Sequence, residues 1–165
     1  IASLSEPFVE DEEKKGQSAA AIQGRVLLVD DNHDNRQLLS VYLQQAGAEV
    51  VLAENGRIGC EKAEAAWREG RAFDVILMDM QMPELDGYGA TARLRGAGYK
   101  GVVIALTANA MSDDRTRCMR AGCSDYLCKP VRREVLWTSG MPSRMRSTPT
   151  KTRLVSVSEV PGGIT

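Results

Sequence analysis

The chain has 165 residues, of which 43% are hydrophobic, 26% charged and 5% aromatic, and its formal net charge is −1. This composition indicates a soluble globular protein with one domain and loose ends, and it excludes disorder throughout. It gives no electrostatic footprint for nucleic acid, and the apolar runs are far shorter than the roughly 20 residues of a membrane-spanning helix. We therefore expect a cytoplasmic segment that contacts neither nucleic acid nor membrane.

Residues 1–24 predict a flexible acidic linker. The charge run Glu10–Lys15 and the small polar residues after it cannot bury enough apolar surface to offset the entropy lost on ordering. The first residue is Ile1 rather than Met. From this we expect a piece of a longer polypeptide.

Five short apolar runs then start at intervals of about 24 to 27 residues. Because nearly every position in them is apolar, they predict strands that are covered on both faces by helices. Each gap leaves room for one crossover helix. The pattern predicts an α/β fold of (βα) units around one parallel sheet, with strands at Val26–Val29, Val50–Leu52, Val75–Met78, Val102–Leu106 and Tyr126–Cys128.

Helices are predicted in the gaps between these strands. The first has apolar residues at helical spacing and ends before Gly47, and the second, with a weaker pattern, ends before Gly70. A third is expected over residues 87–94. A fourth is expected over residues 113–121, with Ser112 as its N-cap.

The segment after the fifth strand predicts only a short helix. Arg133–Trp137 begins an amphipathic helix, but Gly140 and Pro142 follow within two turns. The residues beyond are rich in Ser, Thr and Arg and have no apolar period. We therefore predict a folded domain over residues 25–137, with its fifth helix short or missing, and a disordered tail over residues 138–165.

Polar side chains follow four of the five strands. The carboxyl ends of parallel strands share one edge of a sheet, where ligands bind, so we expect these side chains to meet. Three carboxylates, a hydroxyl and an ammonium then lie at one rim. The residues are Asp30, Asp31, Asp79, Thr107 and Lys129.

Three neighbouring carboxylates predict a cation. Two carboxylates about 5 Å apart repel by roughly 3 kcal/mol at an effective dielectric constant of about 20. An all-oxygen site with room for water is what Mg²⁺ prefers. We predict Asp31, Asp79 and the backbone carbonyl of Gln81 as metal ligands, with Asp30 holding metal-bound water.

Phosphoryl transfer is the reaction that suits this set of groups. It depends on positioning and charge neutralisation, and a carboxylate can be the nucleophile. Asp79 is the predicted nucleophile, because it stands alone after the third strand. Thr107 would donate to one phosphoryl oxygen and Lys129 would pair with another.

Four motifs in this order resemble the response regulator receiver domain over about residues 25–131. The resemblance implies a flavodoxin-like three-layer (βα)5 sandwich with parallel strands in the order 2-1-3-4-5. It implies that Asp79 takes a phosphoryl group from a histidine kinase phosphohistidine, with slow self-catalysed hydrolysis, and that the Lys129–Pro130 peptide bond is cis. The motifs are Leu27–Asn32, Ile76–Gly87, Ile104–Ala110 and Asp125–Pro130.

The stretch Leu106–Met111 is similar to receivers fused behind hybrid sensor histidine kinases. This implies a kinase partner in cis or in trans, a histidine phosphotransfer domain as a further partner, and a parent chain that could be a membrane-anchored kinase. Two alternatives stay open: a free-standing single-domain response regulator, and a receiver-like binding scaffold that never accepts phosphate. The sequence does not define the oligomeric state.

A switch is also expected at the rim. A phosphoryl group adds close to two negative charges, which should draw Thr107 toward it and vacate space behind the fourth strand. Tyr126 could then turn inward. In the family these two positions couple the site to the surface of the fourth helix, fifth strand and fifth helix.

Overall fold

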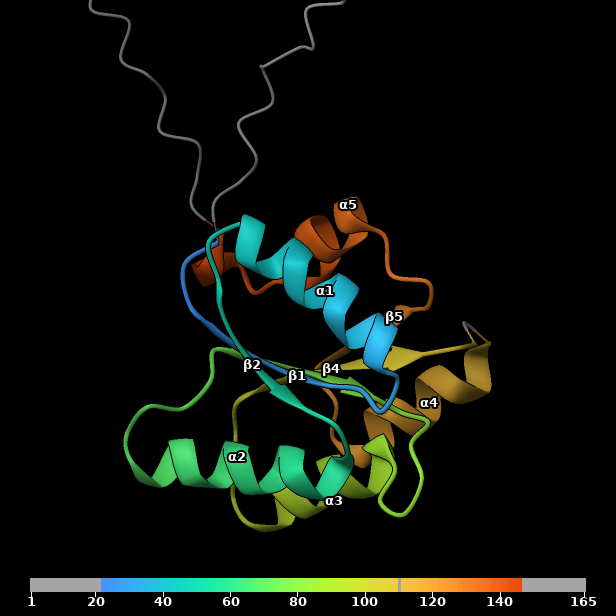
Figure 1. Cartoon of the computed structure of the whole chain (residues 1–165). Helices are drawn as coiled ribbons and strands as arrows, with labels where there is room; N and C mark the ends of the chain where they lie inside the picture. Colours follow the sequence, from blue (N-terminus) through green and yellow to red (C-terminus); the bar gives the residue numbers. More distant parts are fainter. Residues whose placement is uncertain (1–21, 110, 147–165) are drawn as a thin grey trace, which may run out of the picture.

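The fold is a five-stranded parallel sheet between two layers of helices, seen in a computed structural model that describes residues 22–109 and 111–146 (Figure 1). The strand order is β2-β1-β3-β4-β5, which confirms the expected 2-1-3-4-5 order. Register pairs Leu27 of β1 with Val51 of β2 and Ile76 of β3. The strands are β1 (Arg25–Val29), β2 (Glu49–Ala53), β3 (Val75–Asp79), β4 (Val102–Thr107) and β5 (Asp125–Cys128).

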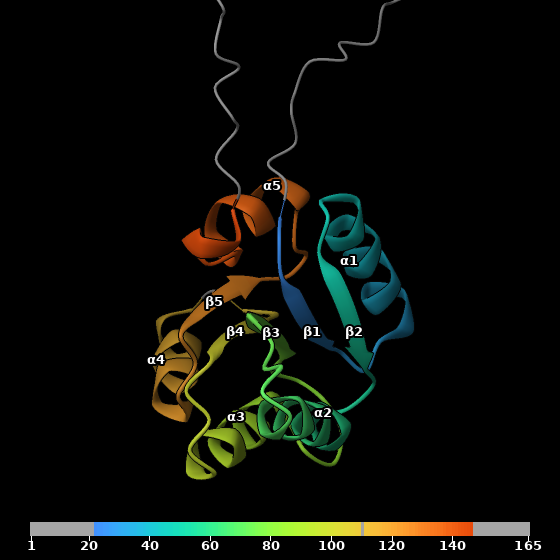
Figure 2. The same cartoon turned by 90° about the vertical axis from the view of Figure 1, so that its left-hand side faces the viewer.

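Alternate residues of the inner strands enter two separate cores. In β1, for example, Leu27 packs in one apolar cluster, and its neighbours Val26 and Leu28 pack in the other. Figures 1 and 2 show α1 and α5 on one face of the sheet and α2, α3 and α4 on the opposite face. Burial on both faces explains why the strands are apolar at nearly every position.

Four helices connect the strands, as predicted. The longest have 13 residues, and no helix of the part that the structure describes is both long and apolar enough to cross a bilayer. The side chains of Asn32, Asn55 and Asp86 cap three of the helices by accepting a backbone N–H. The helices are α1 (His33–Gln45), α2 (Gly56–Arg68), α3 (Gly87–Gly96) and α4 (Ser112–Ala121).

The predicted N-cap of α4 is wrong by one residue. Met111 is the N-cap, Ser112 is the first helical residue, and no side chain caps this end. Asp113 and Asp114 lie in the first turn, where negative charge stabilises a helix N-terminus without a side-chain cap.

The fifth helix is short, as predicted. It consists of α5 (Arg133–Val135) and a turn of π-helix, η1 (Leu136–Gly140). The chain then becomes extended at Met141, before Pro142, and forms a 3-10 turn, η2 (Ser143–Met145).

The folded part extends beyond both predicted boundaries, to residues 22 and 146. Ile22 pairs with Arg146 in an antiparallel bridge. Ile22, Met141 and Met145 are buried in the cluster that faces α1. Residues 138–146 therefore belong to the folded domain, because their methionines contribute to its core, whereas most of the predicted linker and tail lies outside the described residues.

Candidate functional site

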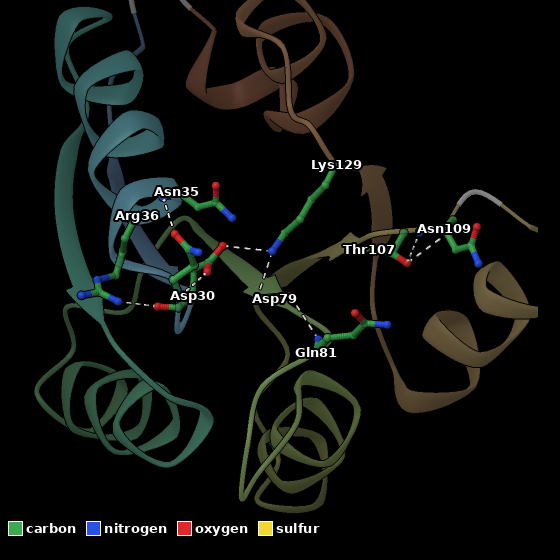
Figure 3. Close-up of polar contacts among 9 residues, drawn as sticks. Asp30, Asn35, Arg36, Asp79, Gln81, Thr107, Asn109 and Lys129 are labelled. Carbon is green, nitrogen blue, oxygen red and sulfur yellow. Dashed lines mark hydrogen bonds and ion pairs between the residues drawn. The ribbon is translucent and has the colours of Figure 1, made fainter.

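Lys129 lies between two buried carboxylates at the carboxyl edge of the sheet. Its Nζ is 3.1 Å from Oδ2 of Asp30, which follows β1, and 3.0 Å from Oδ2 of Asp79, which ends β3 (Figure 3). The side chains of Asp30 and Asp79 are 0% and 4% exposed, against 23% for Lys129. The peptide bond from Lys129 to Pro130 is cis, as expected.

The Asp79 carboxylate is held at both oxygens. Oδ1 accepts the backbone N–H of Gln81 at 3.1 Å, and Oδ2 contacts Lys129. The following loop closes when the N–H of Gly87 donates to the carbonyl of Met80 at 3.1 Å. A Cβ at position 87 would overlap the Asp79 carbonyl oxygen, so the loop requires glycine there.

Burial and ion pairing together set the protonation of Asp79 and Lys129. Desolvation raises the pKa of Asp79 to about 6, although the Gln81 N–H and Lys129 oppose this rise. Burial lowers the pKa of Lys129, but its contacts with Asp79 and Asp30 outweigh burial, so the net pKa is raised. At neutral pH the site therefore pairs the Asp79 carboxylate with the Lys129 ammonium.

The loop after β1 brings in the third carboxylate. Asp31 is exposed, and carboxylate oxygens of Asp30, Asp31 and Asp79 lie within 4.8 Å of one another. One ammonium cannot neutralise three carboxylates. An all-oxygen cluster in which Asp31 gives access to water fits Mg²⁺, which keeps part of its hydration shell.

Two polar contacts order this loop. Oδ1 of Asp30 accepts the N–H of Asn32 at 2.8 Å, and the backbone carbonyl of Asp30 accepts Nη1 of Arg36 at 2.7 Å (Figure 3). Sequence reasoning missed Arg36. Its signal is helical spacing, because Arg36 lies one turn after the cap residue Asn32 and its N–H donates to the Asn32 carbonyl.

Thr107 lies at the same edge but is bonded elsewhere. Its hydroxyl donates to the carbonyl of Asn109 at 3.1 Å and accepts the Asn109 N–H at 3.2 Å (Figure 3). Thr107 is buried, and Tyr126 is half-buried with the guanidinium carbon of Arg115 5.7 Å from its ring centre. The switch roles of Thr107 and Tyr126 therefore stay predictions, as does the ligand role of the Gln81 carbonyl.

An apolar cavity of about 280 Å³ adjoins the site. Asp30 and Lys129 form its polar end, and α1 and the segment after β5 form its walls. On α1, Leu38 is 50% exposed and Val41 is 45% exposed. The apolar lining consists of Leu38, Leu39, Ala108, Pro130 and Val131.

Comparison with known proteins points to one family. A sequence model of the response regulator receiver domain matches residues 26–139. Hybrid signal transduction histidine kinase L of Dictyostelium discoideum is 36% identical over 126 residues, which is 73% of this chain and 7% of that protein. The chain thus spans a small part of that relative.

Two solved structures resemble the fold. The receiver domain of sensor histidine kinase PA1611 from Pseudomonas aeruginosa PAO1, with magnesium coordinated in its active-site cleft, has a TM-score of 0.61 and 40% identity, with 68% of this chain and 90% of that chain covered. The Saccharomyces cerevisiae receiver domain of Ssk1, in a complex with the histidine phosphotransfer protein Ypd1, has a TM-score of 0.58 and 31% identity. The match covers 73% of this chain and 86% of that chain.

Proposed function

We propose that Asp79 accepts a phosphoryl group, because the chain belongs to the response regulator receiver domain family, whose members are the receivers of two-component phosphorelays. One observation carries the assignment to Asp79. It is the buried carboxylate that ends the central strand and contacts Lys129 at 3.0 Å, with the oxygens of Asp30 and Asp31 close by.

The reaction follows from these positions. An oxygen of Asp79 attacks the phosphorus of a phosphohistidine, an O–P bond forms, the N–P bond breaks, and its electron pair stays on the imidazole. Lys129 then pairs with a phosphoryl oxygen while it keeps its contact with Asp30. Thr107 exchanges its bond with Asn109 for one to the new group.

Mg²⁺ is the proposed cofactor, with Asp31 and Asp79 as ligands, the Gln81 carbonyl as a third, and Asp30 holding metal-bound water. Bound Mg²⁺ neutralises charge on the phosphoryl oxygens. Support comes from the carboxylate oxygens within 4.8 Å of one another and from the magnesium in the Pseudomonas receiver.

The proposed donor is a phosphohistidine on a histidine kinase or on a histidine phosphotransfer domain. It would dock on α1 and the segment after β5, where exposed Leu38 lines the 280 Å³ cavity next to Lys129 and Val41 is exposed one turn further along α1. The yeast complex of a receiver with a phosphotransfer protein supports this class of partner. A parent hybrid kinase is proposed from the Dictyostelium relative.

Incubation with a ³²P-labelled phosphotransfer protein and Mg²⁺ tests the role of Asp79. We expect the label to move to this chain as an acyl phosphate that hydroxylamine removes. Asp79→Asn should take no label, and Asp34→Asn, at an exposed position of α1, should label normally. A chain that takes no label from phosphoprotein or from acetyl phosphate would instead be a binding scaffold.

A further inference from the structure

Arg36 makes a contact that the proposed chemistry does not use. It is the fourth residue of α1, it is half-buried, and its Nη1 donates to the carbonyl oxygen of Asp30 at 2.7 Å. Figure 3 shows its guanidinium directed at that carbonyl rather than at Lys129 or Asp79. The side chain also lines an open cavity of about 340 Å³ that Asp31 lines.

This contact fixes one of the two peptide units that flank Asp31. The carbonyl of Asp30 belongs to the peptide unit before Asp31, and Arg36 holds it. The N–H of Asn32 belongs to the peptide unit after Asp31, and Oδ1 of Asp30 holds it at 2.8 Å. Rotation of either unit would swing the side chain of Asp31.

Asp31 depends on this backbone support, because its own carboxylate makes no hydrogen bond or ion pair to any residue in the described ranges. We propose that Arg36 is a positioning residue for the metal site: it holds the Asp30–Asp31 peptide so that the Asp31 carboxylate faces Asp79. This inference rests on the proposed Mg²⁺ site.

If Arg36 acted only through its charge, its removal would change the Mg²⁺ affinity in the opposite direction from the loss of a positioning contact. A guanidinium beside a dication site repels the dication, so removal of the charge by itself would tighten binding. Loss of a positioning contact weakens binding, because an outer-shell partner typically contributes about 10- to 100-fold to metal affinity. The direction in which the Mg²⁺ affinity changes therefore distinguishes a positioning role of Arg36 from a purely electrostatic one.

The test is a calorimetric Mg²⁺ titration of Arg36→Met, which keeps an aliphatic stem but has no donor or charge. We expect the dissociation constant to rise about tenfold. Arg36→Gln loses the same charge and is too short to reach the carbonyl, so it should weaken binding similarly. An unchanged or tighter dissociation constant in the folded variants would overturn the proposal.

Lys62→Met is the matched control. Lys62 lines the neighbouring cavity together with Arg36, and its Nζ donates to a different strand-end carbonyl, that of Leu52, at 2.6 Å. We expect its Mg²⁺ affinity to be unchanged or slightly tighter. A tenfold loss in this variant would show that any nearby basic side chain acts in the same way and would overturn the specific role of Arg36.

Two further measurements separate this inference from the proposed function. Unfolding by urea in EDTA should show that Arg36→Met is fully folded under the conditions of the titration, although the lost hydrogen bond lowers its free energy of unfolding. If the wild type binds no Mg²⁺, the proposed metal site fails. If wild type binds Mg²⁺, Asp31→Asn does not, and Arg36→Met binds like wild type, only the role of Arg36 fails.

Discussion

Asp79 has two properties that oppose each other. Its carboxylate is almost inaccessible to solvent, which raises its pKa to about 6, yet in its proposed role as nucleophile it must be ionised and reachable by a phosphoryl group. Lys129 and the Gln81 N–H limit the rise in pKa, because both favour the ionised form of Asp79. The folded chain therefore holds a destabilising charge at the position where the proposed phosphoryl transfer requires one.

We expect Asp79→Asn to raise the free energy of unfolding at pH 7 by up to about 3 kcal/mol, since one pKa unit corresponds to about 1.4 kcal/mol. The pKa is about 6 in the folded chain against an ordinary value of 3.8, so the folded state binds more protons between these values. Wild-type stability should fall as pH rises through that window. Urea unfolding in EDTA at pH 4 to 8 measures both effects.

Asp34→Asn is the control for this experiment, because Asp34 is exposed in the first turn of α1 and should change stability by less than about 1 kcal/mol. An Asp79→Asn protein that is no more stable than wild type at pH 7 would contradict the raised pKa.

Gly87→Ala should disturb the loop that carries Asp79. A Cβ there would lie 2.7 Å from Cα of Met80 and would overlap the Asp79 carbonyl, so backbone must shift. We expect a loss of about 1–3 kcal/mol in unfolding free energy and slower phosphorylation by acetyl phosphate. Gly96→Ala, in the same helix with no atom within 4 Å of the added Cβ, should be neutral or stabilising. Equal effects of the two substitutions would argue against the close approach.

Helix α1 has two functions in this fold. One side packs Leu39 and Leu43 into the core, while its outer side exposes Leu38 and Val41, of which Leu38 lines the cavity next to Asp30 and Lys129. Exposed apolar side chains next to a reactive group are suited to a protein partner rather than to water. Opposite α1, the cavity is lined by Lys129, Pro130 and Val131, which lie between β5 and the short fifth helix.

Leu38→Ser should therefore separate docking from chemistry. We expect phosphoryl transfer from a phosphohistidine protein to slow about tenfold, because one apolar anchor of the docking surface is lost. Labelling by acetyl phosphate, which needs no docking surface, should not change. Gln37→Ser, at the adjacent exposed position, is the control. An equal loss of rate with the phosphohistidine protein and with acetyl phosphate would show that Leu38→Ser disturbs the site rather than docking.

At the scale of the whole molecule, chain entry and exit lie together, opposite the site. Ile22 precedes β1 and pairs with Arg146, so both lie near the amino edge of the sheet, while Asp30, Asp79 and Lys129 lie at the carboxyl edge. Whatever precedes residue 22 or follows residue 146 joins the domain away from the reactive edge. This arrangement suits the proposed function, in which Asp79 meets a separate phosphoryl donor.

Met145→Ala tests whether the segment after the short fifth helix is part of the domain. Met145 is 1% exposed and packs in the cluster under α1. We expect a loss of about 2–5 kcal/mol in the free energy of unfolding, measured with urea. Met119→Ala, at a 48% exposed position, should cost less than about 1 kcal/mol. A neutral Met145→Ala would restore residues 138–146 to the predicted tail.

The sequence by itself determined the layered α/β fold, because runs that are apolar at every position can only be satisfied between two layers of helices. It also placed Asp30, Asp31, Asp79, Thr107 and Lys129 at one edge, because parallel strands bring their carboxyl ends together. Only the tertiary structure decided the domain limits. Ile22, Met141 and Met145 have no local period, and they become core through contacts with residues distant in the chain. Arg36 was missed for another reason: its partner is the nearby backbone carbonyl of Asp30, so only its position one turn after the cap residue Asn32 marks it.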